Sequence, residues 1–143
     1  MTRRIENILV PLDGSKNSAR GLEMAIKIAG SGESTLTGLI SIEVPPHSEF
    51  KGTGTVSKKA IQEAKKIMNE SKISVEKNGL KFKAKIMQGN IGYNIIKTAH
   101  SKETKYDMIV IGSRGRSSVK EIFFGSTSNY VIHASKIPIL VVK

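Results

Sequence analysis

The residues best suited to chemistry in this chain are glycines and hydroxyl side chains gathered in its last third. An apolar run at 106–111, which we interpret as a buried strand, is followed at once by Gly112, Ser113, Arg114 and Gly115. Nine residues later come Gly125, Ser126 and Thr127, at the start of a helix-length segment, 127–135. Glycine leaves no Cβ between the main chain and a ligand, and the N–H groups of such a loop and helix attract phosphate. The spacing predicts a nucleotide-binding loop, because it holds more glycines and hydroxyls than a strand-to-helix turn needs.

A second candidate segment follows the first apolar run of the chain, residues 5–10. It consists of Pro11, Leu12, Asp13, Gly14 and Ser15. Asp13 has two compatible interpretations, a ligand contact or a helix N-cap, since aspartate before a helical run is a common cap. Arg114 in the later loop is equally open, as a clamp on phosphate or as a solvent-exposed side chain.

Strand-like and helix-like patterns alternate along the chain, which is typical of a parallel sheet with helices on both faces. We expect strands at 5–10, 36–44, 82–87, 107–111 and 137–142, with Pro138 marking the last as an edge strand. Ligands in such sheets bind beyond the carboxyl ends of the strands, where the strand order reverses. If the first and fourth strands are neighbours, both candidate segments face one cleft.

The helices are placed by caps and by apolar periodicity. Ser15 or Ser18 can cap the first helix, whose inward face we predict to be Ala19, Leu22, Ile26 and Ala29, and Gly30 and Gly32 end it. A long helix is expected at 57–78, with its inward face at Ala60, Ala64, Ile67, Ser71 and Val75. The breaker-rich segment 45–54 between strand and helix is predicted to be a mobile loop.

Composition indicates one globular domain, residues 1–143, of 38% hydrophobic and 24% charged residues. The chain has no cysteine, which excludes disulfides and thiolate chemistry, and no apolar run approaches the length of a membrane span. A cytoplasmic location is the expectation. The formal net charge is +11, of which +7 falls in residues 51–85. That lysine-rich face is either an ordinary solvated surface or a binding surface for nucleic acid or an acidic partner.

The two glycine-containing segments, with the terminal run Pro138-Ile-Leu-Val-Val142, resemble the universal stress proteins in their nucleotide-binding branch. The resemblance covers essentially the whole chain. It implies a doubly wound α/β fold with a five-stranded parallel sheet of order 3-2-1-4-5. It also implies a homodimer formed through the fifth strand, at Ile139, Leu140, Val141 and Val142.

The same resemblance implies that the cleft holds ATP, with Mg²⁺. Asp13 would contact the ribose or help to hold the metal, and the end of the second strand, Ile40, Ser41 and Ile42, would line the adenine. Gly112 and Gly115 would pass under the ribose and α-phosphate. Gly125, Ser126 and Thr127 would donate hydrogen bonds to the phosphates.

Three functions remain open at this point. The first is an ATP-binding stress-response protein that acts as a sensor or adaptor, in which the nucleotide orders 45–56 or reshapes a dimer surface. The second is a basic interaction module working through 51–85. The third is a slow ATPase, which the residues favour least, because neither a P-loop, nor a catalytic elbow, nor histidines at metal-ligand spacing occur.

Overall fold

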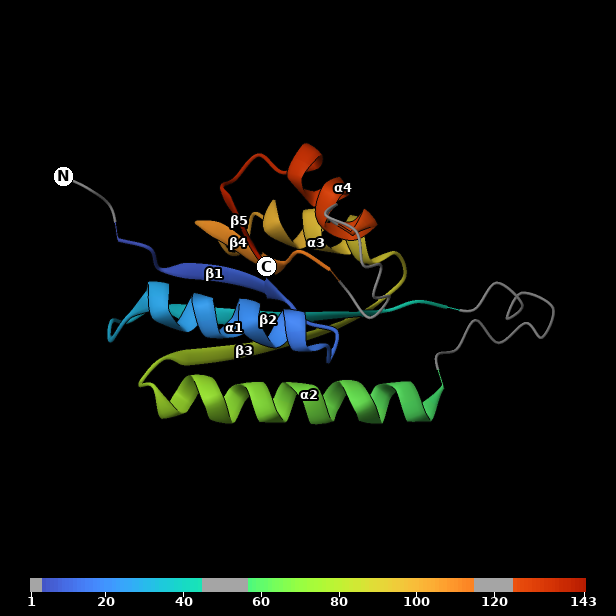
Figure 1. The fold of residues 1–143 in the computed structure, drawn as a ribbon, viewed down its shortest axis with the longest axis horizontal. Coiled ribbons are helices and arrows are strands. Elements are labelled where there is room, and N and C mark those ends of the chain that lie inside the picture. The colour runs from blue at the N-terminus through green and yellow to red at the C-terminus, as the bar shows by residue number, and fades with distance from the viewer. Residues whose placement is uncertain (1–3, 45–56, 115–124) are drawn as a thin grey trace.

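The computed structural model of the chain describes residues 4–44, 57–114 and 125–143. Strands and helices alternate throughout the described residues (Figure 1). They are β1 (Asn7–Pro11), α1 (Lys16–Ala29), β2 (Thr35–Ile42), α2 (Lys58–Lys77), β3 (Lys81–Gln88), α3 (Ile91–Ala99), β4 (Met108–Gly112), α4 (Ser126–Ala134) and β5 (Ile139–Val142).

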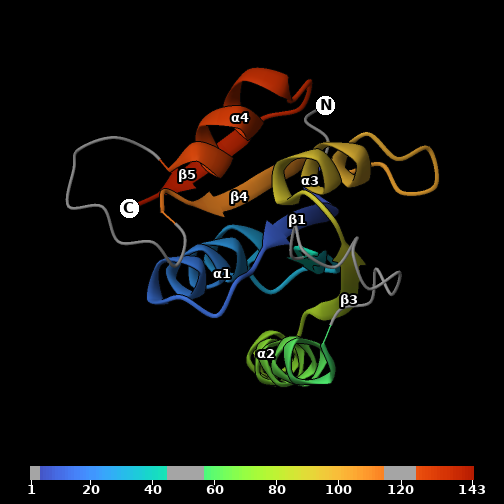
Figure 2. The same cartoon turned by 90° about the vertical axis from the view of Figure 1, so that its right-hand side faces the viewer.

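The five strands form one parallel sheet in the order β3-β2-β1-β4-β5. The predicted fold class and strand order are therefore confirmed. Helices α1 and α2 cover one face and α3 and α4 cover the other, as Figures 1 and 2 show from two sides. Since β1 and β4 are central neighbours, the segments that follow them leave the sheet side by side.

Each face of the sheet carries its own apolar core. Leu22 of α1 and Val75 of α2 pack with Ile8 and Val110 on one face, while Ile95 of α3 and Val131 of α4 pack with Leu9 and Ile109 on the other. β1 and β4 contribute to both cores, which is why they read as continuous apolar runs rather than as alternating ones.

The inward faces of the two long helices differ in part from the prediction. Ala19 is exposed, and the buried residues of α1 are Asn17, Ser18, Gly21, Leu22 and Ala25. Of the predicted stripe, Leu22 is buried and Ile26 and Ala29 pack against the core, so Ala19 is the one member that is wrong. Polar Asn17 and Ser18 occupy core-facing positions in the first turn that an apolar pattern cannot detect. In α2, Ala64, Ser71 and Val75 are buried as predicted, and Met68 joins them.

Helix ends follow the expected chemistry. Ser15 rather than Ser18 is the N-cap of α1: its Oγ accepts the Ser18 N–H at 3.1 Å. Gly30 ends α1 with φ +66°, and Gly79 follows α2 with φ +78°. Both glycines adopt the left-handed conformations that other residues rarely tolerate.

Candidate functional site

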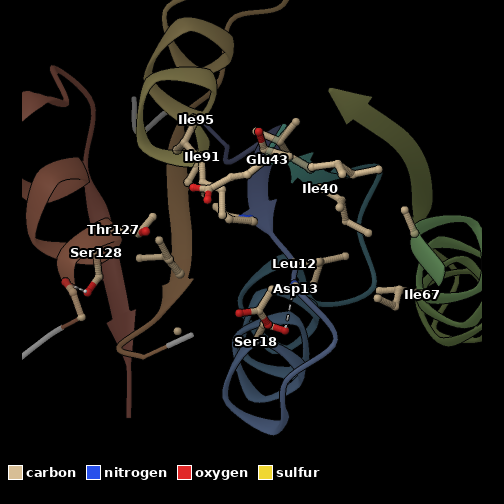
Figure 3. A pocket seen from close by; sticks show the side chains of 18 of the residues that line it. Leu12, Asp13, Ser18, Ile40, Glu43, Ile67, Ile91, Ile95, Thr127 and Ser128 are labelled. Carbon is tan, nitrogen blue, oxygen red and sulfur yellow. Dashed lines mark hydrogen bonds between the residues drawn. The ribbon is translucent and has the colours of Figure 1, made fainter. Parts of the chain in front are cut away.

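A cleft of about 480 Å³ opens at the carboxyl ends of β1, β2 and β4. This is the point where the strand order reverses, between β1 and β4, and it is where doubly wound sheets bind ligands. Figure 3 shows Thr127 and Ser128 of α4 on one side of the cleft and Ile67 of α2 on the opposite side, with Leu12 and Asp13 between them.

Most of the residues predicted from sequence line this cleft. Those that do so are Pro11, Leu12, Asp13, Ile40, Ser41, Ile42, Gly112, Arg114, Gly125, Ser126 and Thr127. Gly14, Ser15 and Ser113 are not among its lining residues, and Gly115 lies outside the described residues, as does segment 45–56. The two segments predicted to share a cleft are thus brought together by the adjacency of β1 and β4.

Gly14 and Ser15 shape the loop beneath the cleft rather than its wall. Gly14 has φ +83°, which lets the chain turn sharply from β1 into α1. Ser15 caps α1, and its own N–H donates to Oδ1 of Asp13 at 2.8 Å. The Asp13 carboxylate therefore braces its own turn while it lines the cleft, but it is not the N-cap of α1, because Ser15 takes that role.

Ser113 is a structural link between β4, β5 and α4. Its N–H donates to the Val142 carbonyl at 2.8 Å, and its carbonyl accepts from Gly125 N–H at 2.7 Å and from Ser128 Oγ at 3.0 Å. The side chain itself is 7% exposed. Through these hydrogen bonds Ser113 holds the start of α4 beside the end of β4.

Asn17, which the sequence analysis did not single out, joins α1 to the loop after β4. Its Oδ1 accepts the Arg114 backbone N–H at 2.6 Å, and its Nδ2 donates to the Val142 carbonyl at 3.3 Å. Only the polarity of Asn17 at a core-facing helix position could have signalled this role.

Asn17 leaves no space for a side chain at position 112, so glycine is required there. A Cβ on Gly112 would lie 2.5 Å from Oδ1 of Asn17 and 2.9 Å from its carbonyl oxygen. The resemblance assigns this glycine to the passage of the backbone beneath the ribose. Its observed neighbour is α1, so close helix-to-strand packing is sufficient to account for glycine here.

The end of the cleft opposite α4 is largely apolar and comes from α2 as well as from β2. Ala60, Ala64 and Ile67 of α2 line this end, whereas Ile91 and Ile95 belong to α3, which packs against α4 and lines the cleft on that side. The sequence analysis predicted that the α2 residues face the core, because an apolar side chain at helical spacing looks the same whether it faces a neighbouring element or a cavity. Two carboxylates, Glu43 and Glu63, line the cleft too and were also missed.

Ser41 lines the cleft, but its hydroxyl is engaged within the protein. Its Oγ donates to the Gly89 carbonyl at 2.9 Å and accepts from Asn94 Nδ2 at 2.8 Å. Asn94, which is 5% exposed, also donates to the Gln88 carbonyl at 2.9 Å. This network fixes the end of β2 against the β3–α3 connection and so sets the position of one cleft wall.

The N-terminus of α4 differs from those of the other three described helices. Ser15, Ser57 and Asn90 cap α1, α2 and α3 with side-chain oxygens, whereas the N-cap of α4 is Gly125, which makes no side-chain cap hydrogen bond. Ser126 and Thr127, its first two residues, line the cleft. A helix N-terminus of this kind presents main-chain N–H groups and a partial positive charge to an anion.

Among the described residues there is no group of three or more histidine, cysteine, aspartate or glutamate side chains that could hold a metal ion. The carboxylate of Asp13 therefore fits only a metal that arrives with its own ligands. Magnesium on a phosphate chain is such a metal, because it keeps water and phosphate oxygens and needs one or two protein carboxylates. No helix in the described part of the chain combines the length and apolar character that crossing a bilayer requires.

The strand order and the cleft at the reversal point define a doubly wound α/β protein whose cleft is bordered by the start of α4, a helix without a side-chain cap. Within that class, residues 4–143 match the model of the universal stress protein family, and the chain belongs to this family. The universal stress protein YxiE of Bacillus subtilis is 30% identical over 152 residues, which cover 95% of this chain and 97% of YxiE.

Solved structures agree with this assignment. The structure of MJ0577, a universal stress protein of Methanocaldococcus jannaschii, superposes with a TM-score of 0.87 at 29% identity, covering 99% of this chain and 97% of that one. A universal stress protein from Archaeoglobus fulgidus in complex with dAMP has a TM-score of 0.74 at 22% identity, covering 96% of this chain and 98% of that one. The second likeness shows a shared fold.

Proposed function

We propose that this protein binds ATP, with Mg²⁺, in the cleft between α4 and α2, and acts in the cytoplasm as a nucleotide-dependent sensor or adaptor in a stress response. The observation that carries the proposal is the polarity of the cleft. The side formed by β2 and α2 is largely apolar, at Ile40, Ala64 and Ile67, and the other side is the N-terminus of α4 without a side-chain cap. A volume of about 480 Å³ is within the range of small-molecule sites.

In this arrangement the base lies among the apolar side chains at the ends of β2 and α2. The phosphates extend past Leu12 and Asp13 toward Gly125, Ser126 and Thr127, whose main-chain N–H groups and hydroxyls would donate to them. Asp13 would hold the magnesium ion or a ribose hydroxyl. The dAMP complex of the Archaeoglobus fulgidus relative supports a nucleotide as the class of ligand.

We propose binding without efficient turnover. Efficient phosphoryl transfer needs a positioned base or water-orienting group and a dense set of cations around the γ-phosphate. Asp13 is the sole carboxylate that we assign to the phosphate path, and its Oδ1 is already occupied by the Ser15 N–H. The signal is then whether ATP is bound, not the product of its hydrolysis. A change in the binding of a partner protein would report that state.

We further propose a homodimer through β5. This strand is at the edge of the sheet and its four residues, Ile139–Val142, are apolar and only half-buried. An apolar edge strand is a ready template for pairing with a second copy. Sedimentation should give twice the monomer mass, and Val141→Lys should yield monomers; monomeric wild-type protein would contradict this part.

The nucleotide proposal is tested by calorimetric titration of nucleotide-stripped protein with Mg-ATP, with GTP and AMP as comparisons. We expect one saturable site per subunit. Thr127→Glu should weaken ATP binding at least tenfold, because the carboxylate meets the phosphates while still suiting a helix N-terminus. Asn129→Glu is the matched control, since Asn129 is exposed in the same turn and does not line the cleft. Absence of binding at millimolar ATP, or equal affinity of the two variants, would overturn the assignment.

A further inference from the structure

The outer edge of β3 carries peptide groups that no described strand pairs. In the sheet, β3 hydrogen-bonds to β2 alone. The N–H of Lys81 donates to the Ser34 carbonyl at 3.3 Å, and the N–H of Gly89 donates to the Ile42 carbonyl at 2.9 Å, both on the β2 side. Because strand peptide groups alternate in direction, those of Phe82, Ala84 and Ile86 point to the open edge.

The side chains of the same three residues form one wall of a groove of about 330 Å³. The other wall is α2, through Lys65, Met68, Asn69 and Lys72. Ile86 is 38% exposed here, so part of the apolar wall faces solvent. Figure 2 shows α2 lying against one face of β3, on the far side of the sheet from α3 and α4. The groove shares no lining residue with the nucleotide cleft.

Lysines surround this edge on both faces of the strand. Lys81, Lys83 and Lys85 are exposed on the face of β3 that points away from the groove, and Lys65 and Lys72 border the groove itself. Residues 57–88 contain nine lysines and three glutamates. Lys72 forms an ion pair with Glu76 at 3.7 Å, with both side chains about half exposed.

These charges select the occupant. A second copy of β3 would set lysine against lysine, and like charges directly opposite in a sheet are destabilising. Edge lysines therefore disfavour basic strands, including a second copy of β3, which is a common protection against aggregation. An acidic strand is the one extended segment that the lysines attract rather than repel. A nucleic acid would meet the lysines but leave the apolar groove and the outward peptide groups unused.

We propose that the edge of β3 accepts an extended segment of an acidic partner protein, added to the sheet as a further strand. Alternate apolar side chains of the segment enter the groove beside Phe82 and Ile86, and its carboxylates lie near Lys72, Lys83 and Lys85. Main-chain hydrogen bonds to Phe82, Ala84 and Ile86 give affinity, while the groove and lysines give selectivity. This interaction does not depend on nucleotide binding.

The probe is the blocked peptide Glu-Val-Glu-Val-Glu-Val-Glu, titrated into the full-length protein labelled with ¹⁵N, with Lys-Val-Lys-Val-Lys-Val-Lys as its charge-reversed counterpart. We expect the acidic peptide to shift the amide signals of Phe82, Ala84 and Ile86 and to slow their hydrogen exchange. Binding should weaken as salt is raised, and the basic peptide should have no effect on these signals.

Two variants separate the main-chain contribution from the charge contribution. Ala84→Pro removes an outward N–H without removing a bond to β2, because proline is tolerated where the N–H faces away from the sheet. We expect it to weaken acidic-peptide binding at least tenfold. Lys83→Glu with Lys85→Glu should abolish binding of the acidic peptide and permit the basic one. The matched control is Lys27→Glu with Lys136→Glu, an equal charge change at exposed sites elsewhere.

Three results would overturn the proposal. One is no change at Phe82, Ala84 and Ile86 with the acidic peptide. Another is peptide binding that both β3 variants leave intact. The third is an oligothymidylate that shifts the β3 signals where the acidic peptide does not, which would identify a general polyanion surface.

Discussion

Oδ1 of Asn17 accepts a hydrogen bond from the backbone N–H of Arg114 at 2.6 Å, although the two residues are 97 positions apart in sequence. The same side chain reaches the Val142 carbonyl at 3.3 Å. One buried amide thus joins α1, the loop after β4 and the end of β5. The position of the Arg114 loop at the cleft follows from this contact and not from the loop alone.

Asn17→Leu should destabilise the protein by about 2–4 kcal/mol, because it removes both hydrogen bonds and leaves the Arg114 N–H and the Val142 carbonyl without this partner. Urea denaturation measures the free energy of unfolding. ATP affinity should fall as well, since the Arg114 loop loses its anchor. A control at Lys16, which is exposed one residue earlier, should leave stability within about 0.5 kcal/mol when changed to Leu. Unchanged stability of Asn17→Leu would show that the 2.6 Å contact contributes nothing.

Gly112→Ala tests the close approach of β4 to α1. The added Cβ would lie 2.5 Å from Asn17 Oδ1 and within 3.0 Å of its main chain, so helix or strand must move. We expect a loss of about 1–3 kcal/mol, as for overpacking in a core. Gly32→Ala is the control, because the nearest atom to its added Cβ is 3.6 Å away and its φ is not positive. Equal melting temperatures for the two variants would refute this account of Gly112.

Asn94→Leu tests the network that holds the end of β2. The substitution removes the donors to Ser41 Oγ and to the Gln88 carbonyl from a side chain that is 5% exposed. A cost of about 1–3 kcal/mol is expected, because a buried acceptor loses its partner. Hydrogen exchange should speed up in β3 and at the start of α3. Thermal unfolding identical to that of the wild type would contradict the prediction.

Glu43→Gln tests the charge of the cleft. In the proposed ATP site, removing this carboxylate should raise ATP affinity by about two- to fivefold at low salt, through a reduced Coulomb repulsion. The gain should shrink for AMP and vanish for adenosine, because the repulsion scales with ligand charge. Calorimetry with the three ligands measures the trend. A loss of adenosine affinity would mean instead that Glu43 accepts a hydrogen bond from the base.

The order of the strands and helices was determined by the sequence itself. Apolar runs, caps such as Ser57 and Asn90, and the helix-ending Gly30 and Gly79 act over a few residues, so they are legible without tertiary structure. The wall of the cleft formed by Gly112 to Arg114 and Gly125 to Thr127 could be predicted for the same reason, since these are contiguous segments at strand and helix ends.

The other half of the cleft was decided only by the tertiary structure. Ala64 and Ile67 of α2 and Ile91 and Ile95 of α3 have the spacing of ordinary core residues, and their exposure to a cavity depends on how far the helices stand from β2. Asn17 and Asn94 are single polar residues whose partners lie elsewhere in the fold. The spacing of apolar residues shows which face of a helix is apolar. It does not show how far that helix lies from the neighbouring strand. The physical reason is that packing is a property of surfaces meeting, whereas capping and turn formation are properties of neighbouring residues.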